Sequence, residues 1–205
     1  DGKDSDFTQG YDHSVAGAGT LEVYLTRSSN GVVEQQVVED ASEKYVDKIN
    51  EFGLREAEWY LCAKDKLKPC IMEPYLYEIT PGYSEMMTSL VVPIIKSGQF
   101  VGVTGADITL PVFQKLTEEL SKALYDGKAK VTLLSHLGLI VGTSHYKEKL
   151  GRPLKEAVSA KSYESYKALK GTKGTNKQGA EIMVSYPIEI KLADVKWMLL
   201  IEVPA

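Results

Sequence analysis

The sequence contains two stretches that follow the same order, one in each half of the chain. Val92-Pro93-Ile94 leads through a turn into a strand that reaches Asp107, and Tyr186-Pro187-Ile188 leads through a turn into a strand that reaches Glu202. Internal similarity of this kind indicates two modules of one architecture. The 205 residues are enough for two modules of about a hundred residues each.

The first half reads as strands around a helix. Apolar and polar residues alternate over 20–26, where Leu21, Val23 and Leu25 share one face, and a second strand over 32–38 follows the turn Ser29-Asn30-Gly31. Asp40 and Glu43 are typical of a helix start, and the helix is interrupted at Gly53 and resumes over 54–66. Strands are expected over 70–79, 86–95 and 100–108, which gives five in all.

A helix is predicted to join the halves, with Thr109 as its cap and Pro111 in its first turn. Its apolar residues recur at helical spacing: Leu110, Phe113, Leu116, Leu120 and Leu124. The second half then repeats a shorter version of the first. We expect strands over 130–135 and 139–144, a helix over 154–169, a loop over 170–179 that reads as a flexible, solvated hairpin, and two closing strands.

Composition and motifs exclude several functions. The net charge is −4 and the pI is about 5.5, without a basic patch, so nucleic acid is not an expected partner. The longest apolar runs are too short for a membrane helix, which needs about 20 residues. The sequence contains no nucleophile elbow, zinc-protease motif or phosphate-binding loop, and His13, His136 and His145 lack a catalytic context. We therefore expect neither an enzyme nor a cofactor.

The two cysteines, Cys62 and Cys70, lie in a segment that reads as helix, turn and strand. They are close enough to form a disulfide in an oxidising compartment, and two small buried thiols are an equally good interpretation. A metal site is not expected, because none of the three histidines lies near them at ligand spacing.

Five segments, in this order, resemble the double Cache sensor domain of bacterial methyl-accepting chemotaxis receptors. They are Asp1 to Phe7, Trp59-Tyr60 with Ala63, Glu73-Pro74-Tyr75, Pro93 to Ile108, and Val131 to Leu154. The resemblance implies an α/β (α+β) fold of two tandem PAS-like modules, each an antiparallel sheet flanked by helices. It places a membrane-distal, ligand-binding module at 1–109, a connecting helix at 110–127 and a membrane-proximal module at 128–205.

The resemblance also implies a context for the chain. Family members have a long helix before the first module, which rises from a membrane span and is missing from this sequence. We expect the chain to be a periplasmic domain of an inner-membrane protein, anchored in the membrane, and to form a homodimer through the missing helix. The expected function is to bind a small molecule and signal across the membrane.

Candidate ligand contacts come from the alternation of side chains along a strand and from the family resemblance. Side chains alternate along a strand, so Glu73, Tyr75 and Tyr77 are expected on one face, which is an unusual composition for a core. In amino-acid-binding members of the family, an Arg and a Trp hold the ligand carboxylate, while the Tyr after the Trp, an Asp two residues beyond a later Tyr, and the Asp of a Gly-x-Asp strand hold the ammonium. Trp59, Tyr60, Tyr75 and Asp107 match that pattern.

Two positions depart from the pattern: Ala57 stands in place of the Arg, and Tyr77 stands in place of one Asp. Arg55 is two residues further back and would point to another side of the helix. Without a guanidinium fork, an α-carboxylate loses its best partner. The remaining carboxylate and aromatic rings predict a cage for a cation.

An amine or other small nitrogenous ligand is therefore preferred to an amino acid, and a purine that stacks on the same rings stays open. Tyr24, on the polar face of the first strand, is a weaker candidate for the pocket wall. The same sensor architecture serves histidine kinases and diguanylate cyclases, so these outputs stay open as well. The alternatives from other classes are a free-standing periplasmic binding protein for amino acids or carboxylates, and a hydrolase, for which the sequence lacks a catalytic set.

Overall fold

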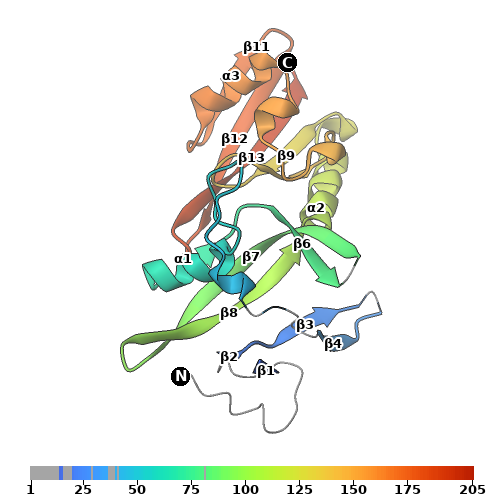
Figure 1. Cartoon of the computed structure of the whole chain (residues 1–205). Helices are drawn as coiled ribbons and strands as arrows, with labels where there is room; N and C mark the ends of the chain where they lie inside the picture. Colours follow the sequence, from blue (N-terminus) through green and yellow to red (C-terminus); the bar gives the residue numbers. More distant parts are fainter. Residues whose placement is uncertain (1–13, 16–19, 29, 37–39, 41, 81) are drawn as a thin grey trace. The chain divides into compact units, whose positions relative to one another are not determined.

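The computed structural model describes residues 14–15, 20–28, 30–36, 40, 42–80 and 82–205 (Figure 1). The segment Asp1 to Phe7 and His13 lie outside the described residues. The chain divides into two compact units. Unit 1 contains residues 1–67 and 93–103, and unit 2 contains residues 68–92 and 104–205. The predicted boundaries at 109 and 127 stay a prediction.

Unit 1 contains two short antiparallel hairpins and one helix. Strand β1 (Ser14–Val15) pairs with β2 (Thr20–Leu21), and β3 (Tyr24–Arg27) pairs with β4 (Val33–Gln36). The strand predicted over 20–26 is thus split in two. Helix α1 (Glu58–Lys66) ends at Leu67, which adopts a left-handed conformation.

The helix predicted to start near Asp40 is wrong. One 3-10 turn forms over Glu43–Tyr45, and the chain then runs irregularly to α1. The reason is local: the side chain of Asn50 accepts hydrogen bonds from the backbone N–H groups of Phe52 and Leu54. This bonding closes a turn around Gly53 at φ +77° and competes with helix formation.

In the segment that leads into the β3–β4 hairpin, the polar face is the more buried one and the apolar face is exposed. Leu21, Val23 and Leu25 are exposed, whereas Glu22 and Tyr24 are half-buried. The alternation was predicted correctly, and the polar face that carries Tyr24 is the more buried one. Burial here follows the polar side chains, because Glu22 pairs with the buried ammonium of Lys44.

Unit 2 begins with an antiparallel sheet. Strand β7 (Tyr83–Lys96) lies between β8 (Gln99–Thr109) on one side and, on the other, β5 (Cys70–Ile71) and β6 (Tyr75–Thr80). Tyr75 lies opposite Met87, and Ile71 lies opposite Leu90. Only the parts of β7 and β8 up to residue 92 and from residue 104 belong to this unit.

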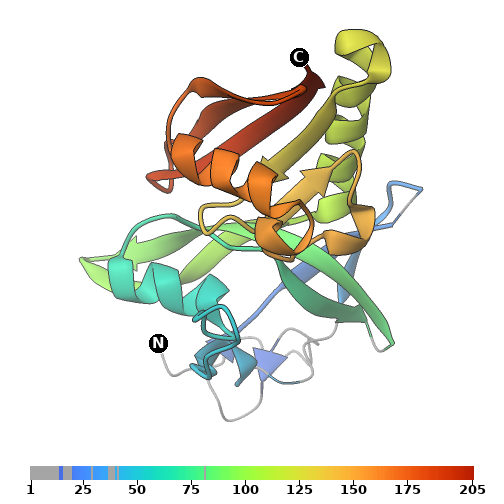
Figure 2. The ribbon, with the colours of Figure 1, turned by 90° about the horizontal axis from the view of Figure 1, so that it is seen from above.

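Helix α2 (Leu110–Ala123) follows β8 directly and leads to a second sheet. Thr109 is the N-cap residue, but its side chain makes no capping hydrogen bond. The second sheet is antiparallel, in the order β10-β9-β13-β12-β11 (Figure 2). Its strands are β9 (Lys130–Leu134), β10 (Ile140–Thr143), β11 (Gly174–Gln178), β12 (Glu181–Ile190) and β13 (Val195–Pro204). These two sheets with their helices confirm the predicted fold class.

Two segments of this half differ from expectation. The helix predicted over 154–169 consists of a 3-10 turn, Leu154–Glu156, and helix α3 (Ala160–Leu169), which Ser159 caps by accepting from the N–H of Ser162. The predicted loop over 170–179 contains β11, which pairs with β12 along its whole length. Short 3-10 turns also lie over Tyr125–Gly127 and Lys147–Lys149.

The second sheet is buried on both faces. Neighbouring residues of β9 face different cores: Leu134 belongs to the core beneath α3, and Leu133 belongs to the core with Trp197 and Leu110. Ile71 and Met86 of the first sheet pack against this second core. The two sheets of unit 2 therefore share apolar packing as well as a connecting helix.

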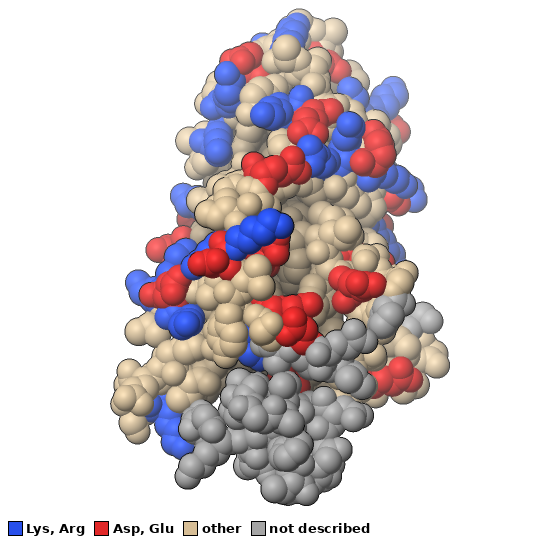
Figure 3. Space-filling view, in the orientation of Figure 1, with Lys and Arg blue, Asp and Glu red and all other residues tan. Residues whose placement is uncertain are grey.

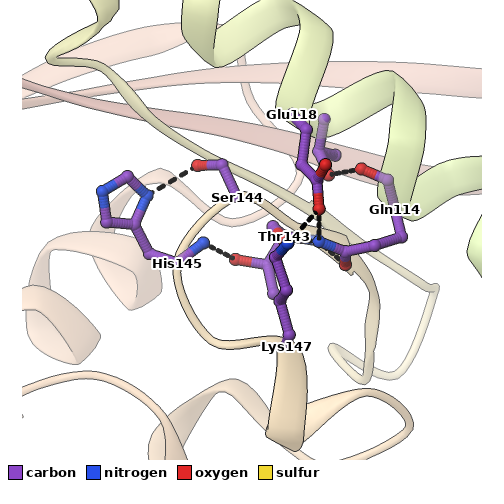
Figure 4. A network of polar contacts seen from close by, with 7 residues as sticks. Gln114, Glu118, Thr143, Ser144, His145 and Lys147 are labelled. Atoms are coloured by element: carbon purple, nitrogen blue, oxygen red, sulfur yellow. Dashed lines mark hydrogen bonds and ion pairs between the residues drawn. The ribbon is translucent and has the colours of Figure 1, made fainter.

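Helix α2 is held to β10 by polar contacts. Figure 4 shows Gln114 and Glu118 of α2 pointing toward Thr143 and Lys147. The amide of Gln114 accepts from the N–H of Thr143 at 3.1 Å and donates to its carbonyl oxygen, while Glu118 accepts from Gln114 at 2.9 Å and pairs with Lys147 at 2.5 Å. The approach is close, because a Cβ on Gly142 would lie 2.8 Å from the backbone of Phe113.

The apolar stripe predicted for this helix is only partly buried. Leu110 is fully buried and Phe113 half-buried, but Leu116 and Leu120 are exposed. The buried side of the helix further along carries hydroxyl groups instead, since Thr117 and Ser121 donate to carbonyl oxygens at 2.9 and 2.6 Å. Because these groups are bonded, the helix can bury them at little cost.

Both cysteines are disulfide-bonded. The sequence contains only Cys62 and Cys70, so the bond joins these two. The sequence left a disulfide and two buried thiols open, and the structure contains the disulfide.

Candidate functional site

Asp107 and Tyr75 are linked in unit 2 by a residue that the sequence did not indicate. The hydroxyl of Ser89 donates to the carboxylate of Asp107 at 2.6 Å, and it lies 2.6 Å from the phenol oxygen of Tyr75. Ser89 is completely buried, Tyr75 is half-buried and Asp107 is exposed. The three residues, which we call the Tyr75–Ser89–Asp107 group, lie on β6, β7 and β8.

The strands come together here because of two local features. Thr88, next to Ser89, is buried and donates to the carbonyl oxygen of Met72 at 2.6 Å, which fixes β7 against the segment before β6. Gly105 brings β8 close to β7, since a Cβ at that position would lie 2.6 Å from the carbonyl oxygen of Leu90. A signal for this arrangement was present in the sequence, because Thr88-Ser89 is a polar pair inside an otherwise apolar strand.

Tyr77 lies beside Tyr75 on the same half-buried face of β6. Their ring centroids are 6.3 Å apart and the rings are tilted by 74°, an edge-to-face arrangement. The face therefore presents two aromatic rings, and one of them, Tyr75, is linked through Ser89 to the carboxylate of Asp107. Such rings with a nearby carboxylate favour a cationic group.

Glu73 lies in the connection before β6, outside the strand itself. Its carboxylate accepts from the hydroxyl of Ser135 and, at 3.1 Å, from the N–H of Leu137. Burial raises the pKa of Glu73, while these hydrogen bonds and the nearby His136 and Lys170 act in the opposite direction. Glu73 thus bonds to the turn between β9 and β10, and its predicted ligand contact stays a prediction.

The other predicted residues belong to unit 1. Trp59 and Tyr60 open helix α1, with ring centroids 5.8 Å apart, and Tyr60 also contacts Tyr45 and Phe100 edge-on, at 5.5 Å each. Burial, together with Tyr45 and Glu22, raises the pKa of Tyr60 to about 12. This is a half-buried aromatic cluster with a phenol that stays protonated at neutral pH.

The environment of Arg55 explains why it does not replace the missing arginine of unit 1. Arg55 precedes α1, and its guanidinium bonds to Glu58 at 2.7 Å and Asp65 at 2.6 Å. These carboxylates raise its pKa and hold it in the charged form. Ala57, at the position where the family pattern has its Arg, is the N-cap of α1 and is buried.

A further charge lies in the same unit, near Tyr24. Lys44 is only 6% exposed, and its ammonium pairs with Glu22 and lies 5.9 Å from the ring centroid of Tyr45. The ammonium of Lys44 is thus held by one carboxylate and one aromatic ring. Tyr24 is half-buried on the Glu22 face of its hairpin.

The predicted site residues therefore form two groups, with Trp59, Tyr60 and Tyr24 in unit 1 and the remainder in unit 2. The exposed carboxylate of Asp107 can accept hydrogen bonds from an ammonium or amide group. In the part of the chain that the structure describes, no cluster of His, Cys, Asp or Glu could hold a metal ion, and no helix is long and apolar enough to cross a membrane.

Acidic and basic side chains are mixed on the surface. In Figure 3, Lys and Arg lie among Asp and Glu over the region that carries α3 and β11. Several of them form ion pairs, such as Lys167 with Glu164 at 2.6 Å and Arg152 with Glu156 at 3.0 Å. Charge on this region is therefore locally balanced.

Two successive antiparallel sheets, joined by a helix, with a carboxylate and aromatic rings gathered on the first, define a tandem-module sensor domain. Residues 13–115 match the family described as methyl-accepting chemotaxis protein-like, first PDC sensor domain. The chain belongs to this family of extracytoplasmic chemoreceptor sensor domains, whose members bind ligands and are not enzymes.

Among known proteins, the chain is similar to the methyl-accepting chemotaxis protein TlpQ of Pseudomonas aeruginosa strain PAO1. The two are 32% identical over 161 residues, which cover 77% of this chain and 22% of TlpQ. A solved structure named methyl-accepting chemotaxis protein X is 26% identical, with a TM-score of 0.66, over 93% of this chain and 65% of that one.

The extracellular domain of a putative histidine kinase, mmHK1S-Z3, has the same fold. It is 21% identical, with a TM-score of 0.68, and the match covers 100% of this chain and 68% of that one. The chain thus spans about a fifth of its curated relative and less than two thirds of chemotaxis protein X.

Proposed function

We propose that this chain is the ligand-binding region of a transmembrane chemoreceptor in the inner membrane, and that it recognises a small nitrogen-containing ligand from the periplasm. The observation that carries the proposal is the Tyr75–Ser89–Asp107 group. A buried hydroxyl bonds an exposed carboxylate and also contacts the phenol of Tyr75, whose ring lies edge-to-face with that of Tyr77. A fixed negative charge with aromatic neighbours recognises an ammonium group.

The residues favour an amine over an α-amino acid as the ligand. Recognition of an α-carboxylate is best served by a guanidinium fork. Ala57 occupies that position of the family pattern, and Arg55 is bonded to Glu58 and Asp65. One solved chemoreceptor domain of this fold, PctC of Pseudomonas aeruginosa PAO1, is described in complex with GABA, which carries an amine and a carboxylate but is not an α-amino acid. A purine that stacks on the tyrosines is the alternative ligand class.

The proposed context of the receptor follows from its family. We infer a membrane anchor and a dimer formed through a helix that precedes the first module. Ligand binding favours one of two arrangements of the distal module, and the following strands pass that preference toward the membrane. A second output is favoured by one observation: the extracellular domain of a putative histidine kinase shares this fold over the whole chain.

A thermal-shift screen tests the ligand class. The chain is mixed with small primary amines, amino acids, purines and small carboxylates, and the unfolding midpoint is recorded for each. A ligand at a hundredfold excess over its dissociation constant stabilises by ~2.7 kcal/mol, which moves the midpoint measurably. The expected result is a rise with amines that is lost in Asp107→Asn.

The matched control is Asp47→Asn, which removes an exposed carboxylate in unit 1. It is expected to keep the shift. No response from any class, or the same response with Asp107→Asn, would contradict the proposed site. A shift with purines alone would replace the amine by a stacking ligand.

A further inference from the structure

Glu73 links two parts of unit 2 that are far apart in the sequence. Its carboxylate accepts from the hydroxyl of Ser135 and from the N–H of Leu137. Both partners belong to the turn between β9 and β10, in the second sheet. Glu73 itself leads into β6, in the first sheet. One side chain therefore bonds the start of β6 to a turn of the other sheet.

The turn that receives Glu73 is tightly built. Ser135 is 1% exposed, and its hydroxyl donates to Glu73 while it accepts from the N–H of Leu139 at 3.0 Å. Gly138 closes the turn at φ +88°, and a Cβ there would lie 2.9 Å from the hydroxyl of Tyr166. With so little free space, a movement of the carboxylate is passed on to the turn rather than absorbed locally.

The segment that begins near Glu73 leads to Tyr75, a member of the Tyr75–Ser89–Asp107 group. Tyr75 follows Glu73 by two residues and bonds through Ser89 to Asp107. Pro74 between them is buried and has a fixed φ, so the segment is stiff. Met72 precedes Glu73 directly, and its N–H donates to the carbonyl oxygen of Ser89 at 2.8 Å. A change at Ser89 thus reaches Glu73 through short, bonded steps.

We propose that Glu73 is the residue that couples the Tyr75–Ser89–Asp107 group to the second sheet, so that the state of that group is reported at the β9–β10 turn. The inference rests on the proposed function for its biological meaning. The coupling itself is a property of the chain and is measurable without a ligand. Coupling of this kind requires a physical element that both sites bias, and the Met72–Tyr75 segment is that element.

Native-state hydrogen exchange tests the coupling. The readout is the protection of the Leu137 amide, which donates to Glu73, and the Leu200 amide in the centre of the second sheet serves as the reference for global unfolding. Ser89→Ala is expected to lower the protection of Leu137, relative to Leu200, by about fivefold. In a Glu73→Ala background, Ser89→Ala is expected to change it no further.

Two variants serve as controls. Glu78→Ala removes a carboxylate of β6 that accepts from the N–H of Gly82 at 2.6 Å in a different turn, and it should leave the Ser89→Ala effect intact. Glu73→Gln keeps a side-chain oxygen that accepts from the N–H of Leu137, although its amide N–H reverses the direction of the bond to Ser135, so it should retain the coupling even if Glu73→Ala does not fold.

The outcomes separate this inference from the proposed function. If Ser89→Ala has the same effect with and without Glu73, or leaves Leu137 unchanged in the natural chain, the coupling does not exist. If the coupling is observed but the ligand screen gives no response, the proposed ligand class fails while the coupling stands.

Discussion

Gln114 pairs with the backbone of Thr143 as a neighbouring strand would, through one hydrogen bond accepted from the N–H and one donated to the carbonyl oxygen. Strand β10 lies at the edge of its sheet, where these groups would otherwise lack a strand partner. Helix α2 therefore covers that edge with a side chain and is fixed to the sheet by the same contact.

Gln114→Glu is expected to destabilise the chain by about 2 kcal/mol at neutral pH. The substitution replaces an amide donor by a carboxylate that faces the carbonyl oxygen of Thr143 and the carboxylate of Glu118. Urea unfolding followed by circular dichroism measures the loss. At about pH 4 the new side chain is largely protonated, so the difference from the natural chain should shrink. An equal loss at both pH values would show that these contacts do not carry the stability.

Gly142→Ala is expected to cost about 2 kcal/mol, because overpacking forces backbone to move. Its Cβ would lie 2.8 Å from the carbonyl group of Phe113, so α2 would have to shift away from β10. Gly174→Ala is the control, since its Cβ would meet only the end of the Leu169 side chain, at 3.1 Å. Thermal unfolding of both variants checks the difference, and equal midpoints would contradict it.

Glu22→Gln is expected to cost about 3 kcal/mol, because it leaves the ammonium of Lys44 buried without its counter-charge. The double variant Glu22→Gln with Lys44→Met removes both charges and should recover most of that loss. Equilibrium unfolding of the single and double variants measures the coupling between the two residues. Additive losses would mean that the ion pair is not a unit.

Ser89→Ala is expected to destabilise the chain by about 1 kcal/mol, because the buried hydroxyl bonds to both Tyr75 and Asp107. Affinity for the ligand identified in the screen should fall about tenfold, which corresponds to about 1.4 kcal/mol, since Asp107 loses the group that fixes its position. Ser84→Ala, at an exposed position of the same strand, is the control for calorimetric binding. Unchanged affinity in Ser89→Ala would remove Ser89 from the site.

His145 should make the chain less stable as the pH falls below neutrality. Burial and the positive charge of Lys130 lower the pKa of His145 below its usual 6.5, so the unfolded chain takes up the proton first. The stabilising contribution is fully present above pH 6.5 and is lost as the pH falls from there through the lower pKa of His145 in the folded chain. Between about pH 7.5 and about pH 5.5, the natural chain should lose more stability than His145→Gln. Parallel pH profiles would contradict this.

The sheets were the more predictable part of the fold, because apolar stretches such as 86–95 and 100–108, separated by the turn Lys96-Ser97-Gly98-Gln99, are a strong local signal. The helix expected near Asp40 failed for a reason that propensity does not include: Asn50 bonds to the backbone at Phe52 and Leu54 and closes a turn. Leu116 and Leu120 were misplaced for a similar reason, because bonded hydroxyl groups occupy the buried side of α2.

The candidate site could be predicted only in part. Tyr75 and Asp107 were identified by resemblance, and the structure brings them together. Ser89 was missed although Thr88-Ser89 is a polar pair within an apolar stretch, because the partners of Ser89 on the neighbouring strands are not known until the strand pairing is known. The bonds of Glu73 were equally hidden, since its partners lie more than sixty residues further along the chain.

The two-sided burial of β9 has a consequence for the evolution of this fold. Leu133 and Leu134 face different cores. Inserting or deleting one residue in β9 would therefore move each side chain to the opposite face of the sheet and disrupt the packing of both cores. Length changes among relatives should therefore accumulate outside β9, and a sequence that aligns with a gap inside this strand is better explained by a misplaced gap than by a real indel.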